Sequence, residues 1–137
     1  MRSFYTYSFE RLEVWQLARA FKKEIYQITL RFPSEEKFGY TSQIRRAAPS
    51  ITVNLAEGSG RASNVDKANF TNMAYTSALE VIDHLIGVYD LEFISEELYT
   101  SLRIDLDHII NKLNALYKYQ MKQETSLKQK IKTGSIE

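Results

Sequence analysis

The sequence predicts an all-α protein, an up-down-up-down antiparallel four-helix bundle with a left-handed twist. Five glycines and two prolines are few for 137 residues, and most lie between segments whose apolar residues recur every three or four positions. The connections between these segments are short, which favours antiparallel neighbours in a bundle. With 44% hydrophobic residues, the chain can build a core and is sized for one domain.

The first helix is expected over residues 9–31, with Phe32 and Pro33 at its end. Its inward stripe has the spacing of a bundle core and consists of Val14, Leu17, Ala18, Phe21, Ile25 and Ile28. A second apolar group lies a quarter to half a turn away and consists of Leu12, Trp15, Tyr26 and Leu30. A helix with two apolar faces requires two partners.

The second helix is expected over residues 41–57, with Gly58 as a C-cap in the left-handed conformation. Pro49 falls inside it, removes one backbone hydrogen bond and costs ~3 kcal/mol in an unadapted helix, so a local kink is expected. The inward residues are Ile44, Ala48, Ile51 and Leu55. An adjacent row of small and polar residues, which permits close helix approach, consists of Gln43, Ala47, Ser50 and Asn54.

The third helix is expected over residues 64–91, where Ser63 is a good N-cap and Asp66 completes a capping-box pattern. Its inward row is predicted to be Phe70, Met73, Ala74, Ser77, Val81, Leu85 and Val88. This helix also carries a second apolar row, which consists of Tyr75, Leu79, Ile82, Ile86 and Tyr89.

The fourth helix is expected over residues 96–122, with one broad apolar stripe. Its inward residues are Leu102, Leu106, Ile109, Leu113 and Leu116. The bundle domain is thus predicted to occupy residues 1–123. The polar, lysine-rich tail at 124–137 is predicted to be disordered, because it carries too few apolar residues to pack. A helical extension that docks on a neighbour is the alternative.

Composition excludes several classes of protein. Eighteen basic and seventeen acidic residues give a net charge of +1, without the strong basic excess typical of nucleic-acid binders. Cysteine is absent, so disulfides and thiolate metal sites are excluded. No apolar run reaches the ~20 residues of a membrane span, and the N-terminus lacks the apolar core of a signal peptide. A cytoplasmic protein without membrane contact is expected.

The sequence offers little for catalysis. Bundle di-metal sites use Glu-x-x-His pairs, whereas Glu80 precedes His84 by four residues and His108 lies opposite the apolar stripe of its helix. Neither histidine stands near a serine with an obvious acidic orienter. The glycine-rich turn at 58–61 lacks the lysine and spacing of a phosphate-binding loop. The sequence therefore predicts a non-enzymatic protein with no metal and no cofactor.

Residues 43–61, with the sequence QIRRAAPSITVNLAEGSGR, carry a family resemblance. Set between long amphipathic helices, this segment resembles the "four helix bundle protein" family, first found as reading frames inside intervening sequences of bacterial large-subunit (23S) rRNA genes. The resemblance covers roughly residues 8–120 and implies the bundle fold and no established catalytic activity. Relatives that serve diversity-generating retroelements form pentameric barrels and hold nucleic acid and a reverse transcriptase, so the resemblance implies a homopentamer with such partners.

Five cationic side chains are predicted to contact phosphate: Arg45, Arg46, Arg61, Lys22 and Lys23. The structural alternative is that Arg46 pairs with a carboxylate of a neighbouring helix or subunit. The surplus apolar side chains are predicted to form an oligomer interface of Leu12, Trp15, Tyr26, Tyr75, Leu79, Ile82, Ile86 and Tyr89. If these stripes lie on different sides, the contact is head-to-tail and generates a ring. Aromatic residues at helical spacing are interpreted as interface packing rather than as a stacking platform for bases.

The predicted function is thus a homo-oligomeric assembly protein or accessory factor whose partner is RNA, DNA or a nucleic-acid enzyme. The alternative is a purely structural oligomer, or a protein–protein interaction module, without nucleic-acid contact.

Overall fold

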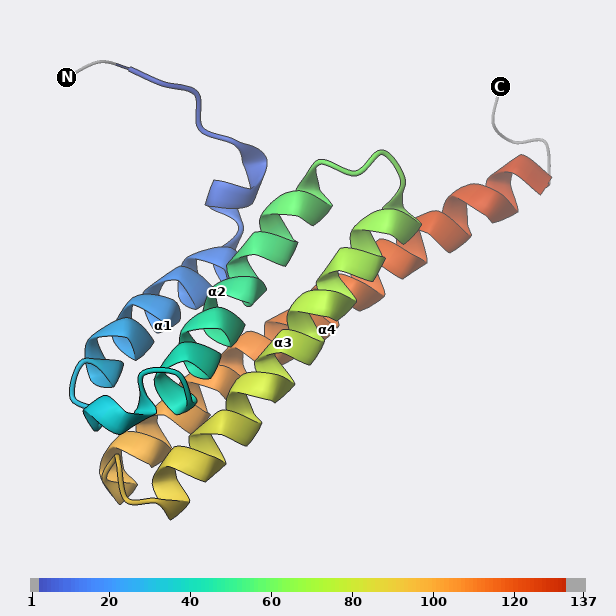
Figure 1. Ribbon diagram of the computed structural model, residues 1–137. Helices are drawn as coiled ribbons and strands as arrows, with labels where there is room; N and C mark the ends of the chain where they lie inside the picture. The colour runs from blue at the N-terminus through green and yellow to red at the C-terminus, as the bar shows by residue number, and fades with distance from the viewer. Residues whose placement is uncertain (1–2, 133–137) are drawn as a thin grey trace.

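In the computed structural model, which describes residues 3–132 and the side chains of residues 3–123, four long helices pack in sequence as an antiparallel bundle (Figure 1). This confirms the predicted fold class. The helices are α1 (Glu13–Thr29), α2 (Tyr40–Ser59), α3 (Asn64–Asp90) and α4 (Glu96–Lys132). Short 3₁₀ helices, η1 (Ser8–Arg11) and η2 (Ser34–Glu36), precede α1 and α2. None of the described helices is both long enough and apolar enough to cross a membrane.

The core follows the predicted three-and-four spacing most closely in α1 and α4. Their buried apolar residues are Val14, Ala18, Phe21 and Ile25 in α1, and Leu102, Leu106, Ile109 and Leu113 in α4. Ser63 caps α3 as expected, because its side chain accepts a hydrogen bond from the Asp66 amide at 3.1 Å. Ser95 caps α4 in the same way, through the amide of Leu98.

The most extensive helix pair is α2 with α3, and small side chains allow it. Ala47 and Ala48 of α2 and Ala74 and Ala78 of α3 are almost completely buried. The hydroxyl groups of Ser50 and Ser77 lie 2.8 Å apart across the same contact. The two helices can therefore approach closely.

The prediction that Phe70 and Met73 face inward was wrong. Phe70 is half-buried and Met73 is exposed, whereas Thr71, Ala74 and Ala78 face the core. The prediction favoured the largest apolar residues of this helix, but close approach to α2 leaves room only for small ones.

Gly58 has a different role from the predicted one. Helix α2 continues through it to Ser59, and the C-cap is Gly60, with a φ of −88° rather than a left-handed value. Gly58 is buried, and a Cβ atom added to it would lie 2.8 Å from Cβ of Phe70. The chain thus uses Gly58 to let α3 approach, not to end the helix.

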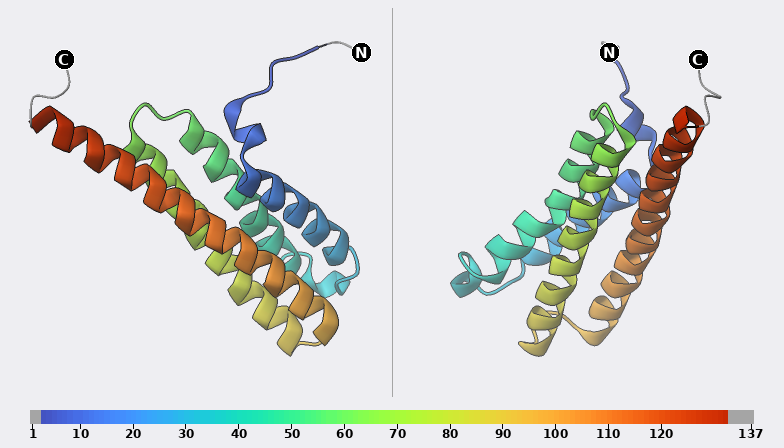
Figure 2. Two further views of the ribbon diagram at one scale, coloured as in Figure 1. Left: turned by 180° about the vertical axis from the view of Figure 1, so that it is seen from behind. Right: turned by 90° about the vertical axis from the view of Figure 1, so that its right-hand side faces the viewer.

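Helix α2 stays helical through Pro49. The right-hand view of Figure 2 shows α2 changing direction about midway along its length, where Pro49 stands. A bend is expected there, because proline lacks the amide hydrogen and its ring collides with the preceding turn.

Two further large apolar residues are exposed, and Leu17 is one that was predicted to face inward. Leu17 lies beside a hollow between α1 and α4, the two neighbouring helices that touch least. Phe38 is 87% exposed in the connection between η2 and α2.

Helix α4 extends to Lys132, ten residues beyond the predicted end at Lys122. No glycine or proline interrupts residues 123–132, and Gln, Lys and Glu are good helix formers, so the backbone continues as a helix. That part of the predicted disordered tail is therefore helical. The remainder, 133–137, lies outside the described residues, and docking of this extension on a neighbour stays a prediction.

Replacing Gly58 by alanine should destabilise the bundle by about 1–3 kcal/mol, because the added methyl group overpacks the α2–α3 contact. Gly60 is the matched control, because its added Cβ atom would meet only the Glu57 carbonyl oxygen, at an ordinary 3.5 Å. Urea denaturation of Gly58→Ala and Gly60→Ala would compare the two free energies of unfolding. Equal effects of the two substitutions would contradict the tight contact at Gly58.

Candidate nucleic-acid interface

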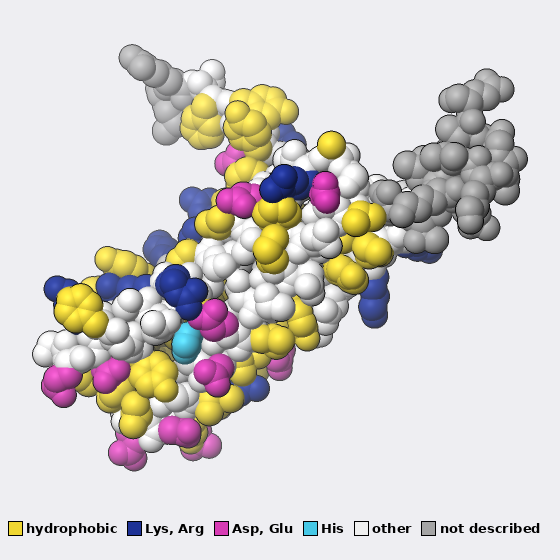
Figure 3. Space-filling view, turned by 45° about the vertical axis from the view of Figure 1, so that its right-hand side comes forward, with side chains coloured by type: hydrophobic (Ala, Val, Ile, Leu, Met, Phe, Trp, Pro, Cys, Tyr) yellow, Lys and Arg dark blue, Asp and Glu magenta, His cyan; other side chains and the backbone are white. Residues whose placement is uncertain are grey.

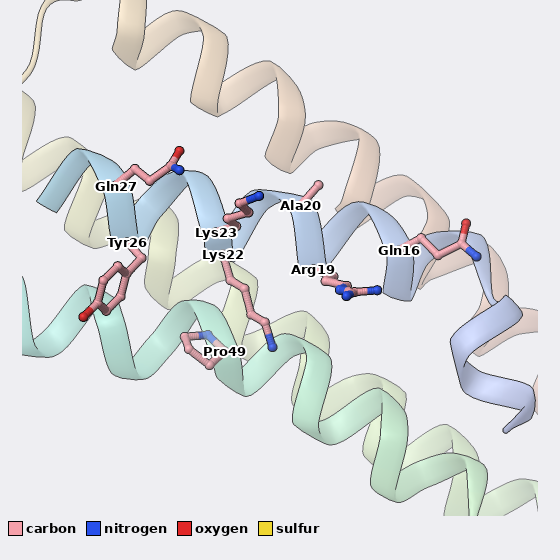
Figure 4. Close-up of a pocket in the computed structure, with 8 residues that line it drawn as sticks. All are labelled: Gln16, Arg19, Ala20, Lys22, Lys23, Tyr26, Gln27 and Pro49. Carbon is pink, nitrogen blue, oxygen red and sulfur yellow. The ribbon is translucent and has the colours of Figure 1, made fainter. Parts of the chain in front are cut away.

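A groove of about 780 Å³ runs along α1, beside the middle of α2 (Figure 4). Its lining residues are Gln16, Arg19, Ala20, Lys22, Lys23, Tyr26 and Gln27 from α1, with Pro49 from α2. Three of these side chains are cationic and none is acidic. The groove therefore presents a positive surface to any ligand that enters it.

Lys22 reaches across the groove toward α2 (Figure 4). Its ammonium group donates to the Thr52 hydroxyl at 3.1 Å, and that hydroxyl donates to the Pro49 carbonyl at 2.9 Å. An ammonium group has three donors, so this contact positions the charge and leaves the group able to bind an anion.

Arg45 lies beside the groove and is held in place by α1. Its guanidinium group stacks 4.0 Å from the ring of Tyr26. Its Nε atom donates to the Thr29 hydroxyl at 2.7 Å, and one Nη atom donates to the Tyr26 carbonyl at 3.4 Å. Because arginine has five N–H donors, Arg45 combines a fixed position with remaining capacity for a ligand.

The other two predicted phosphate-binding residues, Arg46 and Arg61, do not line the groove. Arg46 forms an ion pair with Glu80 of α3 and also donates to Gln43, as the structural alternative expected. Arg61 lies over the ring of Phe70, at 4.4 Å, beyond the end of α2. Of the five predicted residues, Lys22 and Lys23 line the groove and Arg45 borders it.

Arg19 lines the groove but was not among the predicted residues. Its guanidinium group also lies 5.6 Å from the centre of the Trp15 ring. The sequence did contain the signal, because residues 19, 22, 23 and 26 follow the spacing that places side chains on one helix face.

Charge is unevenly distributed along the chain. Residues 1–32 contain six Lys or Arg and three Asp or Glu, whereas residues 61–95 contain two and five. In Figure 3, acidic side chains gather at the lower end of the bundle and basic side chains along its upper left edge. The net charge of +1 therefore conceals a basic region at α1.

His84 contacts side chains of two neighbouring helices, α2 and its own helix α3. Nε2 of His84 lies 3.1 Å from the Glu80 carboxylate that also binds Arg46, and its ring packs edge-on against Tyr40. Within the described part of the chain, no three His, Cys, Asp or Glu side chains gather closely enough to hold a metal ion.

Glu24 is a titratable group that the sequence reasoning missed. With Asp105 and His108 it lines a hollow of about 150 Å³ between α1 and α4. Burial raises the pKa of Glu24, and the nearby negative charge of Asp105 raises it further. This carboxyl group faces α4 and adds no negative charge to the groove lining.

The predicted oligomer interface divides into two sets. Leu12, Trp15, Tyr75, Ile82 and Tyr89 are half-buried and pack against the core of the same chain. Tyr26, Leu79 and Ile86 are exposed, as is Leu30 at the end of α1. Part of the surplus apolar surface is thus covered within the subunit, and the exposed part lies on α1 and α3.

Comparisons with known proteins agree with this architecture. The signature of the 23S rRNA-intervening sequence protein family matches residues 10–115. The chain is also similar to the crystal structure of a protein of unknown function from the S23 ribosomal protein family of Bacteroides thetaiotaomicron. The TM-score is 0.72 at 28% sequence identity, over 77% of this chain and 95% of the other. No curated protein matches the chain.

Proposed function

Because the chain belongs to the 23S rRNA-intervening sequence protein family, we propose that it is a non-enzymatic, self-associating accessory factor that binds the phosphate backbone of RNA or DNA in the cytoplasm. The observation that supports this function is the groove on α1, which Arg19, Lys22 and Lys23 line with no carboxylate among the lining residues.

The groove suits a polyanion physically. Lysine and arginine side chains that neutralise phosphates release condensed counterions, and this release drives sequence-independent binding. The amide groups of Gln16 and Gln27 add neutral donors of the kind that contact phosphate and sugar oxygens. The low overall charge does not oppose this, because the Debye length is only about 8 Å at physiological salt and local charge therefore dominates.

Self-association is supported by apolar side chains that the subunit leaves uncovered. Leu79 and Ile86 of α3 are 43% and 40% exposed, and Tyr26 and Leu30 of α1 are exposed as well. These residues belong to two different helices. A head-to-tail contact, in which α1 of one subunit meets α3 of the next, would cover both exposed surfaces and could close into a ring. The ring size of five rests on the family resemblance alone.

The same apolar residues support a second candidate function. A structural oligomer, or a protein–protein interaction module, would use the exposed faces of α1 and α3 and would need no nucleic acid. The two candidates differ in what they require of the cationic groove.

Reversing two groove charges in Lys22→Glu/Lys23→Glu should weaken binding to a structured RNA by about tenfold or more at low salt, because phosphate contacts are lost. The slope of log K against log salt should become shallower by about one unit per lost contact. Filter binding at about 50 mM and about 200 mM salt measures both effects.

The matched control is Lys118→Glu/Lys122→Glu, which makes the same charge change at exposed positions of α4. Equal losses in the two double variants would show that only net charge matters and would contradict the groove. If the natural protein fails to bind RNA or DNA at low salt, the structural alternative stands instead.

Leu79→Asp/Ile86→Asp should shift the protein to a smaller assembly, because two charges would have to be buried in the contact. Sedimentation equilibrium gives the mass, and circular dichroism checks that the helices persist. Val53→Asp/Ile104→Asp is the control, since these apolar residues are also exposed but lie on α2 and α4. A natural protein that stays at the monomer mass of 15.9 kDa at every concentration would rule out self-association.

A further inference from the structure

An ordered arm leads away from the bundle ahead of η1, as both Figure 1 and Figure 2 show. Its aromatic side chains are largely exposed to solvent: Phe4, Tyr5 and Tyr7 are 80%, 71% and 60% exposed. Exposed aromatic rings held in a fixed position are unusual on a free surface and indicate a ligand or partner.

Two hydrogen bonds join the arm to η1, and a third joins η1 to α1. Arg11 donates to the Thr6 carbonyl at 3.0 Å, and the Tyr7 amide donates to the Glu10 carboxylate at 2.7 Å. The side chain of Gln16 donates to the Glu10 carbonyl at 2.9 Å, and Gln16 also lines the groove. The arm is thus linked through η1 to Gln16, a residue of the groove lining.

The aromatic rings form a continuous series from the arm to the groove. Ring centres are 4.9 Å apart for Tyr5 and Tyr7, 6.5 Å for Tyr7 and Phe9, and 5.2 Å for Phe9 and Trp15. Arg19 then lies over Trp15 and lines the groove itself. We call Tyr5, Tyr7, Phe9 and Trp15 the aromatic ladder.

Two acidic groups lie near the ladder, and each has a partner within the chain. The Glu10 carboxylate accepts the Tyr7 amide, and the Glu13 carboxylate lies 3.1 Å from the ammonium group of Lys112 on α4. The cationic side chains of Arg11 and Arg19 flank the ladder, so its surroundings favour an anionic ligand that also has flat apolar surfaces.

We propose that the ligand of this face is single-stranded nucleic acid, whose unpaired bases stack on Tyr5 and Tyr7 while its backbone continues past Arg19 into the groove. This inference rests on the proposed function and specifies its ligand. Aromatic rings beside a cationic groove are the arrangement that binds single strands without sequence preference. Bases of a duplex are already stacked inside it and cannot reach exposed rings.

A second copy of the chain is the competing occupant of the arm. Two of the three most exposed rings of the arm are tyrosines, whose hydroxyl groups a dry protein contact would have to satisfy. A protein partner would also have to neutralise Arg11 and Arg19 beside the ladder. A polyanion satisfies both requirements, so the observations favour nucleic acid.

Trp15 makes the test direct, because it is the only tryptophan of the chain and belongs to the ladder. A uridine 15-mer titrated into the full-length protein at low salt should quench Trp15 fluorescence and bind more tightly than an RNA duplex of the same length. Tyr5→Ala/Tyr7→Ala should weaken binding of the single strand by about tenfold or more. The affinity of this variant for the duplex, and the salt dependence of its RNA binding, should not change, because no phosphate contact is lost.

Phe38→Ala is the matched control, because Phe38 is 87% exposed and Lys37 lies 5.5 Å from its ring centre, far along the chain from the ladder. It should leave binding of the single strand and the duplex unchanged. Tyr5 and Tyr7 lie outside the bundle core, so circular dichroism of their variant should match that of the natural protein.

Each contrary result has a distinct meaning. If the tyrosine variant binds the single strand as the natural protein does while Lys22→Glu/Lys23→Glu does not, the ladder inference fails and the proposed function stands. Tighter binding of the duplex would also overturn the inference. If the tyrosine variant instead has a lower mass in sedimentation, the arm contacts a second copy. If the natural protein binds neither RNA, the proposed function fails as well.

Discussion

The rest of the bundle depends on the close approach of α2 to α3. Small side chains and Gly58 bring the two backbones together, and Ser50 and Ser77 satisfy each other across the contact. Helix α1 then packs on α2 and α4 on α3, while α1 and α4 touch only slightly. Because α1 is attached mainly through α2, its outer face remains free and forms the groove.

The sequence alone predicts the buried face of a helix where that face is made of large apolar residues. The inward rows of α1 and α4 are made mainly of Val, Phe, Ile and Leu. The predicted and observed positions agree except at Leu17, which is exposed, and at Ile28 and Leu116, which are only half-buried. The contact between α2 and α3 is built from alanine and glycine, and the spacing of large apolar residues does not show which face of α3 lies in it. Phe70, Met73 and Ser77 of α3 were therefore assigned to the inward row in place of Ala68, Thr71 and Ala78, whereas Ala74 was assigned correctly. Gly58 was assigned to a helix end.

The candidate site was only partly predictable for a related reason. Lys22 and Lys23 follow from their place on α1, and Arg19 could have been found by the same spacing. The ion pair of Arg46 with Glu80 depends on the register between α2 and α3, which a single sequence does not contain. The aromatic ladder was missed because Tyr5, Tyr7 and Phe9 precede α1, where helical periodicity gives no information.

The proposed path of nucleic acid follows the arm and the outer face of α1. Hydrogen–deuterium exchange measured by mass spectrometry, with and without a uridine 15-mer, locates the bound strand directly. Binding along this path should slow exchange in peptides that cover residues 3–12, have smaller effects at residues 13–27 and 45–52, and leave exchange along α3 unchanged. Protection confined to α3, or none at residues 3–12 while RNA is bound, would contradict it.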